Sequence, residues 1–167
     1  MNARANPTQA LRPFLPQDAP FLAEIFRSSV EELTSEDYSK AQQDAWVTAV
    51  DDLETFSKRL AGQLTLIATL DGSAVGFISL AGTEQIDMLY VHPAVARQGL
   101  GAMLCGALEK LAAARGAPRL TVDASDSARE FFEHRGYAGK QRNTVTLAGE
   151  WLANTTMEKK LAQGSAP

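Results

Sequence analysis

The stretch that decides the fold lies at residues 91–102 and reads VHPAVARQGLGA. Its first residues end an expected strand, Gln85–His92, and its last residues begin an expected helix, Leu100–Leu111. Gly99 and Gly101 let the backbone come close to a ligand, because glycine carries no Cβ. The first N–H groups of a helix have no partner inside it, and the positive end of the helix dipole lies there. This pattern predicts a phosphate or pyrophosphate site.

Two common phosphate motifs do not account for this stretch. The dinucleotide fingerprint requires a third glycine, and the P-loop requires Gly-Lys-Ser/Thr, and neither follows Gly101. Arg97 supplies a formal positive charge instead. On the residues alone, the alternative is a glycine-rich helix start that turns tightly and binds nothing.

The segments around this stretch predict a mixed sheet. Leu64–Leu70 and Val75–Leu80 read as strands and flank the pair Asp-Gly at residues 71 and 72, which suits a tight hairpin. Together with the strand before the quoted stretch they form an antiparallel meander. Leu120–Val122 reads as a strand after the helix, and a strand–helix–strand unit makes its two strands parallel neighbours.

The two ends of the chain complete the expected fold. A first strand is expected at Leu11–Leu15, and a closing antiparallel pair at Thr144–Leu147 and Trp151–Lys160. Capping residues are expected at the starts of four helices: Asp18, Ser39 with Gln42, Asp52, and Ser127 with Glu130. The sequence therefore predicts one mixed α/β (α+β) domain over residues 9–161, with flexible tails at residues 1–8 and 162–167.

Composition and charge exclude several classes of protein. The chain has 167 residues and a net charge of −4, and no face or tail is dominated by Lys and Arg, so a nucleic acid is not an expected partner. Met1–Thr8 lacks the apolar run of a signal peptide, and no stretch approaches the ~20 apolar residues that cross a membrane. The single cysteine, Cys105, forms no intramolecular disulfide and reads as a small core residue. We therefore expect a cytoplasmic protein without membrane contact.

Residues 91–102 resemble motif A of the GNAT superfamily of acetyltransferases, in which Gln/Arg-x-x-Gly-x-Gly/Ala follows a strand that ends in Val-x-Pro. Residues 128–137, with the sequence AREFFEHRGY, resemble the family's Ala-x-x-Phe-Tyr-x-x-x-Gly-Phe/Tyr segment. Residues 121–125, TVDAS, are similar to a branch that reads Val-acidic-Ala-Ser there. Two motifs at compatible spacing make the resemblance specific from Ile86 to Tyr137.

Three positions depart from the family pattern. The first Gln/Arg of motif A is Ala96, and the frequent Asn before the last helix is Ser125. The position of the usual tyrosine acid is Phe132, which has no proton to donate. A CoA-binding module without turnover, acting as a sensor or partner domain, is therefore the alternative to an enzyme. Transfer of a bulkier acyl group is a further alternative.

The resemblance implies a GNAT fold, with a mixed, mostly antiparallel sheet that is flanked by helices and splayed at the acetyl-CoA site. It implies direct transfer from acetyl-CoA to a primary amine of a small molecule or peptide in a ternary complex, without a metal. The Leu89 N–H group would polarise the thioester carbonyl. The residues that the resemblance assigns to acetyl-CoA are Leu89, Tyr90, Val91, Arg97, Gln98, Gly99, Leu100, Gly101, Ala102, Ser125 and Phe132.

Attack on the thioester requires an amine that has lost its proton, so a general base is expected. Asp87 and Glu84 are candidates, directly or through water, although each could also be an ordinary surface carboxylate. A thiol with a pKa of ~8.5 is a fair leaving group, so a dedicated acid is not obligatory. If there is one, Tyr137, Ser125 or Tyr90 could serve.

In this family the early helices and the last hairpin cover the acceptor pocket. Tyr38, Trp46 and Trp151 are candidate walls, because an aromatic face attracts a cationic amine. Core packing is the alternative for Trp46, which lies on an apolar helical face. Asp123 could orient the substrate or only cap the next turn. A homodimer that pairs through the last strands is compatible with this arrangement.

Overall fold

A seven-stranded sheet in the order β1-β2-β3-β4-β5-β7-β6 forms the centre of the computed structural model, which describes residues 8–162. The strands are β1 (Gln9–Pro13), β2 (Leu64–Leu70), β3 (Ser73–Ala81), β4 (Gln85–Val91), β5 (Arg119–Ser125), β6 (Ala138–Leu147) and β7 (Glu150–Lys160). All neighbouring pairs are antiparallel except β4 and β5, which are parallel. The predicted meander and its parallel crossover are confirmed.

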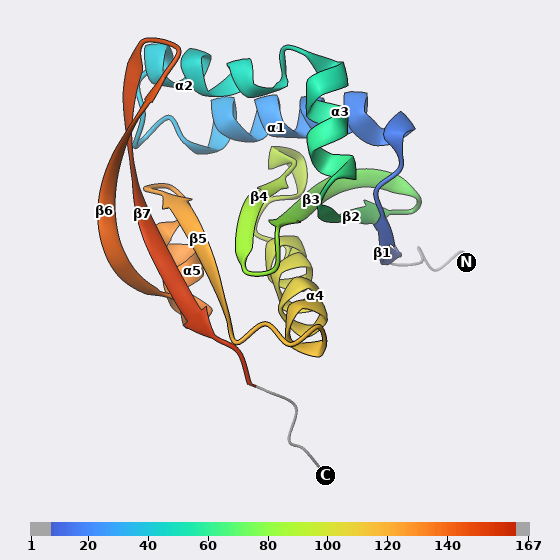
Figure 1. Ribbon diagram of the computed structural model, residues 1–167. Helices are drawn as coiled ribbons and strands as arrows, with labels where there is room; N and C mark the ends of the chain where they lie inside the picture. The colour runs from blue at the N-terminus through green and yellow to red at the C-terminus, as the bar shows by residue number, and fades with distance from the viewer. Residues whose placement is uncertain (1–7, 163–167) are drawn as a thin grey trace, which may run out of the picture.

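Five α-helices cover the two faces of the sheet. They are α1 (Ala19–Leu33), α2 (Lys40–Val47), α3 (Leu53–Ala61), α4 (Leu100–Ala114) and α5 (Arg129–His134). Figure 1 shows α1, α2 and α3 together above the sheet, α4 below it, and α5 behind β5 and β7. Among residues 8–162, no helix is both long enough and apolar enough to span a membrane.

Alternation along β3 divides the apolar residues into two cores. Phe77 is fully buried in the core between the sheet and α1 and α3, where it meets the edge of the Phe56 ring. Its neighbour Ile78 is fully buried in the other core, with Leu104 and Leu108 of α4. Burying one such side chain stabilises the fold by about 1.5–3 kcal/mol. Leu111, the last residue of the expected helix, lies at the margin of this core and is 38% exposed.

Several local predictions are confirmed at the level of single bonds. β2 has the predicted bounds, and the turn after it has positive φ angles of 48° at Asp71 and 85° at Gly72, as a type I′ hairpin requires. The Ser39 hydroxyl accepts a hydrogen bond from the Gln42 N–H group, and the Gln42 side chain bonds back to Ser39. Asp52 caps α3.

Asp18 is the N-cap residue of α1, as predicted, but the expected capping bond is absent. Its carboxylate accepts two hydrogen bonds from the Arg12 guanidinium, at 2.7 and 2.8 Å, and one from the Leu15 N–H group at 2.8 Å. Arg12 is six residues away on the first strand, so a charged donor outcompetes the helix amides for this carboxylate.

The predicted capping box at Ser127 and Glu130 is wrong. The Ser127 hydroxyl donates to Asp37, 90 residues earlier in the chain, at 2.7 Å. The turn before α5 is closed instead by Ser125, whose hydroxyl accepts a hydrogen bond from the Ala128 N–H group. The capping box does not form because the Ser127 hydroxyl is hydrogen-bonded to the Asp37 carboxylate, which is distant in the sequence.

Strand bounds differ from the predictions at both ends of the chain. β1 begins and ends two residues before the predicted Leu11–Leu15, and β6 begins at Ala138 instead of Thr144. β6 is an edge strand whose residues are mostly exposed, so its first half has no apolar alternation to find. The predicted tails fall largely on residues 1–7 and 163–167, which lie outside the described residues. Thr8, at the end of the first tail, bonds to Asp71 through its N–H group.

A β-bulge interrupts β4 at Asp87. Ser79 of β3 pairs with Met88, but the next residue of β3, Leu80, pairs with Ile86, so Asp87 has no partner in the ladder. Ile86 belongs to the core below the sheet and Met88 to the core above it. A bulge bends a strand and increases its twist, so β4 changes direction here.

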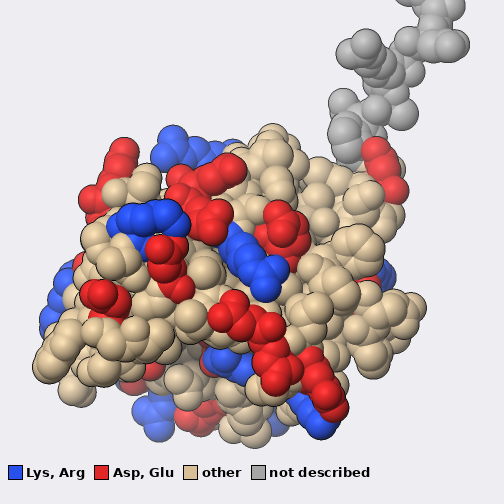
Figure 2. Space-filling view, turned by 90° about the horizontal axis from the view of Figure 1, so that it is seen from above, with Lys and Arg blue, Asp and Glu red and all other residues tan. Residues whose placement is uncertain are grey.

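The helical layer above the sheet is acidic. Residues 16–63 contain ten Asp and Glu residues but four Lys and Arg residues, which gives this segment a charge of −6 in a chain of net charge −4. Figure 2, which views the molecule from this side, shows red acidic side chains in greater number than blue basic ones. The remainder of the chain is therefore slightly basic.

Candidate functional site

The parallel strands β4 and β5 separate soon after they meet. They pair through two residue pairs, Gln85 with Thr121 and Ile86 with Val122, and the bulge at Asp87 follows at once. Beyond this point β4 remains paired with β3 on one side and β5 with β7 on the other. The predicted splay of the sheet is confirmed, and each strand turns an open edge toward the gap.

Backbone groups of β4 point into this gap. His92 donates its N–H group to Val75 of β3 at 2.8 Å, so the backbone groups of His92 face β3. Alternate residues of an antiparallel strand present their backbone groups to opposite edges, so those of Leu89 and Val91 face the gap. These groups can pair with an extended ligand as with an additional strand.

The start of α4 stands at the same gap with open hydrogen-bond donors. Gly99 is the N-cap residue and has a φ of 83°, in the left-handed region that favours glycine. The first helical bond of α4 joins the Met103 N–H group to the Gly99 carbonyl at 3.0 Å. The amides of the three residues between them have no acceptor within the helix. A Cβ at Gly101 would lie 3.5 Å from the Phe131 ring, so this wall is close-packed.

A single cavity of about 650 Å³ joins the gap, the start of α4 and the space under α1 and α2. The predicted site residues that line it are Tyr38, Trp46, Asp87, Leu89, Tyr90, Val91, Arg97, Gly99, Leu100, Gly101, Ala102, Asp123, Ser125 and Phe132. They come from six separate segments, so their meeting is a consequence of the fold. Arg97 has a positive φ of 63° and joins no ion pair with a residue in the described range, 8–162.

Three predicted site residues do not line the cavity: Gln98, Tyr137 and Trp151. Gln98 is exposed in the turn before α4. Trp151 is 68% exposed near the tip of the last hairpin, where its carbonyl accepts a hydrogen bond from Gln42. Glu84, the second candidate base, is also outside the lining and forms an ion pair with Arg119.

Tyr137 belongs to a closed polar cluster below the sheet, which we call the Glu109 cluster. Its hydroxyl donates to the Glu109 carboxylate at 3.1 Å, and Arg135 and Lys159 donate to the same carboxylate at 2.9 and 3.1 Å. Cys105 lies 3.8 Å from the Tyr137 hydroxyl and is fully buried, as predicted for a core cysteine. Burial, with the nearby Cys105 and Glu109, raises the pKa of Tyr137. The cluster ties α4 to β7 and to the end of α5.

Asp87 is the lining carboxylate with the most partners. Arg59 of α3 donates to both of its oxygens at 2.8 Å, and Gln63 donates to one of them at 2.9 Å. Burial alone would raise the pKa of Asp87, but the hydrogen bonds from Arg59 and Gln63 outweigh it and hold the pKa below its ordinary value. Asp87 is therefore ionised at neutral pH.

Aromatic side chains form the upper wall of the cavity. The Trp46 indole N–H group donates to the Tyr90 hydroxyl at 3.2 Å, and the Tyr90 ring packs 4.4 Å from the Phe26 ring. Burial raises the pKa of Tyr90 to about 12, so its hydroxyl keeps its proton at neutral pH. Trp46 thus both packs against the core and lines the cavity.

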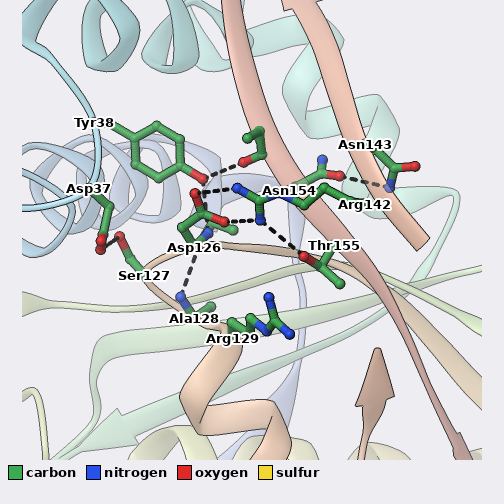
Figure 3. Close-up of polar contacts among 12 residues, drawn as sticks. Asp37, Tyr38, Asp126, Ser127, Ala128, Arg129, Arg142, Asn143, Asn154 and Thr155 are labelled. Carbon is green, nitrogen blue, oxygen red and sulfur yellow. Dashed lines mark hydrogen bonds and ion pairs between the residues drawn. The ribbon is translucent and has the colours of Figure 1, made fainter. Parts of the chain in front are cut away.

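Tyr38, in the loop between α1 and α2, links that loop to two other segments of the chain, and Figure 3 shows its polar contacts. Its hydroxyl donates to the Ala153 carbonyl of β7 at 2.6 Å and accepts a hydrogen bond from the Asp126 N–H group at 2.9 Å. Asp126 also forms an ion pair with Arg142 of β6. Three segments that are far apart in the sequence therefore meet at one hydroxyl group.

Sequence reasoning missed several residues of the lining. Those outside the recognised motifs are Ser29, Leu33, Thr34, Ser127, Val145, Leu147, Leu152, Ala153 and Asn154. The alternation of Val145 and Leu147 in an expected strand was a signal, since it gives that hairpin an apolar face. Within the described range, no group of three or more His, Cys, Asp and Glu side chains is arranged to hold a metal ion.

Comparisons with known proteins agree with this geometry. The family model described as Acetyltransferase (GNAT) domain matches residues 34–161. The chain is 34% identical over 150 residues to the uncharacterized N-acetyltransferase YafP of Escherichia coli (strain K12), which covers 90% of this chain and 95% of that one.

Solved structures have the same fold. A GCN5-related N-acetyltransferase from Rhodopseudomonas palustris is 60% identical and has a TM-score of 0.90, with 96% of this chain and 99% of that one covered. The PaiA N-acetyltransferase from Thermoplasma acidophilum, solved in complex with coenzyme A, has a TM-score of 0.77 at 19% identity, with coverage of 92% and 99%.

Proposed function

We propose, from the premise that this chain belongs to the GNAT family of acetyl-CoA-dependent acyltransferases, that it acetylates a primary amine of a small molecule or peptide. The amine attacks the thioester carbonyl directly while both substrates are bound. A nitrogen–carbon bond forms, the carbon–sulfur bond breaks, and CoA leaves as the thiolate. The amine proton passes to a base or to water.

The observation that carries this proposal is the gap between β4 and β5, with the open start of α4 beside it. The amides of Leu100, Gly101 and Ala102 are donors for the pyrophosphate, and Arg97 contributes a positive charge. The backbone groups of Leu89 and Val91 pair with the pantetheine chain. The Leu89 N–H group then polarises the carbonyl oxygen, which is worth about 10²–10³ in rate for a well-placed donor.

Asp87 is the proposed base. It lines the cavity and is ionised, but Arg59 and Gln63 occupy its oxygens and lower its pKa, so it accepts a proton weakly. A water molecule between Asp87 and the amine fits this weak base better than direct transfer. No tyrosine acid is included, because the Tyr137 hydroxyl is bonded to Glu109, Phe132 has no hydroxyl group, and burial raises the pKa of Tyr90 to about 12, which makes it a weak acid. The thiolate takes its proton from solvent.

The acceptor enters under α1 and α2 in this proposal. Tyr38 and Trp46 form the aromatic wall, and Asp123 faces the incoming amine. The acidic layer above the sheet attracts a cationic substrate from solution. Ser125 and Phe132 line the floor near the expected thioester. We place the reaction in the cytoplasm, where a lone thiol such as Cys105 stays reduced.

The test is the release of CoA thiol by the purified chain. Acetyl-CoA is expected to raise the melting temperature, and addition of a suitable amine from a broad panel is expected to release thiol, followed with a thiol reagent. Thermal stabilisation without amine-dependent release across the panel would favour the alternative of a CoA-binding sensor without turnover, which the absence of a hydroxyl group at Phe132 suggests. No stabilisation by acetyl-CoA would end the proposal.

A further inference from the structure

One wall of the cavity changes from polar to apolar along a single direction. Residues two apart on a strand share a face, so the pairing of β5, β7 and β6 places their side chains in rows. From the middle of the sheet to the hairpin tip, the rows are Asp123 with Thr156, Ser125 with Asn154 and Asn143, Leu152 with Val145, and then Leu147, whose partner Glu150 lies outside the cavity lining. Six of these nine residues line the cavity.

The polar end presents a carboxylate that is fixed but lacks a counter-ion. Asp123 accepts a hydrogen bond from the Thr156 hydroxyl at 2.6 Å. Asn143 donates to both Thr156 and Asn154, at 2.8 and 2.9 Å, and Figure 3 shows the second of these bonds. In the part of the chain that the structure describes, no ion pair joins Asp123 to a cation. An ammonium group is the ligand that such a carboxylate accepts.

The apolar end is open to solvent. Leu33, at the end of α1, is 44% exposed, and Val145 on β6 is 40% exposed, and both line the cavity. The charged residues in the described lining are Asp87, Arg97 and Asp123, so this end has none. Covering this apolar surface with the body of a ligand is favourable, in proportion to the area removed from water. A second ammonium group placed at this end would find no carboxylate in this part of the described lining to pair with.

We propose that the acceptor is a monocationic amine with an apolar body. Asp123 holds its ammonium group until the proton passes through water to Asp87, and the body lies between Leu33 and Val145. This inference rests on the proposed acetyl transfer and selects one class within it. It separates alkylamines and arylalkylamines from diamines and polyamines, which carry a second charge where the wall is apolar.

The experiment compares two amines of equal length, n-hexylamine and 1,5-diaminopentane, at saturating acetyl-CoA. The expected kcat/KM is about tenfold higher for n-hexylamine, since the two amines differ only at the far end, where one has a methyl group that the apolar wall covers and the other an ammonium group left unpaired. Val145→Asp should abolish or reverse this preference. Thr144→Asp is the matched control, because it adds the same charge to the next residue of the same strand, which is outside the lining.

A preference for the diamine, or an unchanged ratio in Val145→Asp when its melting temperature is that of the wild type, would overturn the inference. If Val145→Asp does not fold, Leu33→Asp tests the same end from α1. Turnover of other amines with neither of these two would also overturn it, while the acetyltransferase proposal would stand. Absence of thiol release with every amine would instead refute the proposed function.

Discussion

Glu109 and Asp123 are carboxylates on either side of the same sheet, and they differ in how far their hydrogen-bonding capacity is used. Glu109 accepts bonds from Tyr137, Arg135 and Lys159, and its side chain is 11% exposed. Asp123 accepts one bond from Thr156 and faces the cavity. Burial alone would raise the pKa of Glu109, but the bonds from Lys159 and Arg135 outweigh it and hold the pKa below its ordinary value.

This difference separates a structural charge from a binding one. A carboxylate whose partners all belong to the chain has no capacity left for a ligand, whereas removing it leaves those partners unpaired. A carboxylate with open capacity contributes little to folding and much to recognition. Asp87 lies between the two extremes, because it is paired with Arg59 and still lines the cavity.

The largest effect is expected from Glu109→Gln. The free energy of unfolding should fall by about 3 kcal/mol, because Arg135 and Lys159 lose their counter-ion while largely shielded from water. Urea denaturation measures this loss. Glu133→Gln, which removes the exposed partner of Arg129, is the control and should cost less than about 0.5 kcal/mol. Equal losses in the two variants would break the contrast between buried and open charges.

Asp87→Asn should reduce kcat by about 10², the lower end for a general base. In the wild type the rate should rise with pH as the amine loses its proton, because Asp87 is already ionised above its lowered pKa. The pH profile of kcat is the measurement. Glu84→Gln is the control, since Glu84 is outside the cavity lining and pairs with Arg119. A loss confined to Glu84→Gln would move the base to that residue.

Arg97→Glu tests the same contrast for positive charges, because Arg97 has no ion-pair partner among the described residues whereas Arg135 is paired with Glu109. We expect acetyl-CoA binding to weaken about tenfold at low salt, by like-charge repulsion from the phosphates, and the loss to shrink as salt is added. Calorimetric titration at two ionic strengths measures it. Lys110→Glu, on an exposed position of α4, is the control for net charge. Unchanged affinity at low salt would remove Arg97 from the site.

The smallest effect is expected from the hydroxyl groups. Tyr38→Phe removes two bonds to backbone groups and should cost about 1 kcal/mol of stability, and it should also raise the KM for the amine. Tyr137→Phe, in the Glu109 cluster, should cost a similar amount and leave that KM unchanged. Denaturation and steady-state kinetics on both variants separate the two roles. A rise in the KM of Tyr137→Phe would contradict the assignment of that cluster to structure alone.

Local signals made most of the sheet and the α4 loop predictable. β2 alternates between apolar and polar residues over most of its length, Asp71-Gly72 joins it to β3, and Gly99 marks the start of α4. The two failed caps have one cause in common. Asp18 and Ser127 have the right neighbours for a cap, but Arg12 and Asp37 reach them through tertiary structure. A sequence pattern does not include that competition.

The parts of the candidate site that consist of backbone groups were predictable from the sequence. The parts that depend on contacts between side chains far apart in the sequence were not. The open amides before Met103 follow from the glycines. The pairing of Asp87 with Arg59, 28 residues away, has no counterpart in local spacing. Tyr137 illustrates the opposite error, because a motif position suggested a reactive hydroxyl group that the fold gives to Glu109.

Asp87 affects the site in two separate ways. Its carboxylate is the proposed base, and its backbone is the extra residue that forms the bulge in β4. Before the bulge, the Glu84 carbonyl accepts a bond from Thr121 of β5, so even-numbered residues face that strand. After the bulge, the backbone groups of the odd-numbered Leu89 and Val91 face the side of β5. The regular two-residue spacing of hydrogen-bonding groups that a parallel strand requires is therefore broken. Any residue type at position 87 would interrupt the hydrogen-bond ladder between β4 and β5 in this way. Substitution at Asp87 can therefore abolish proton transfer and leave the opening intact, whereas a chain shortened by one residue would allow the seam to continue and close the cleft.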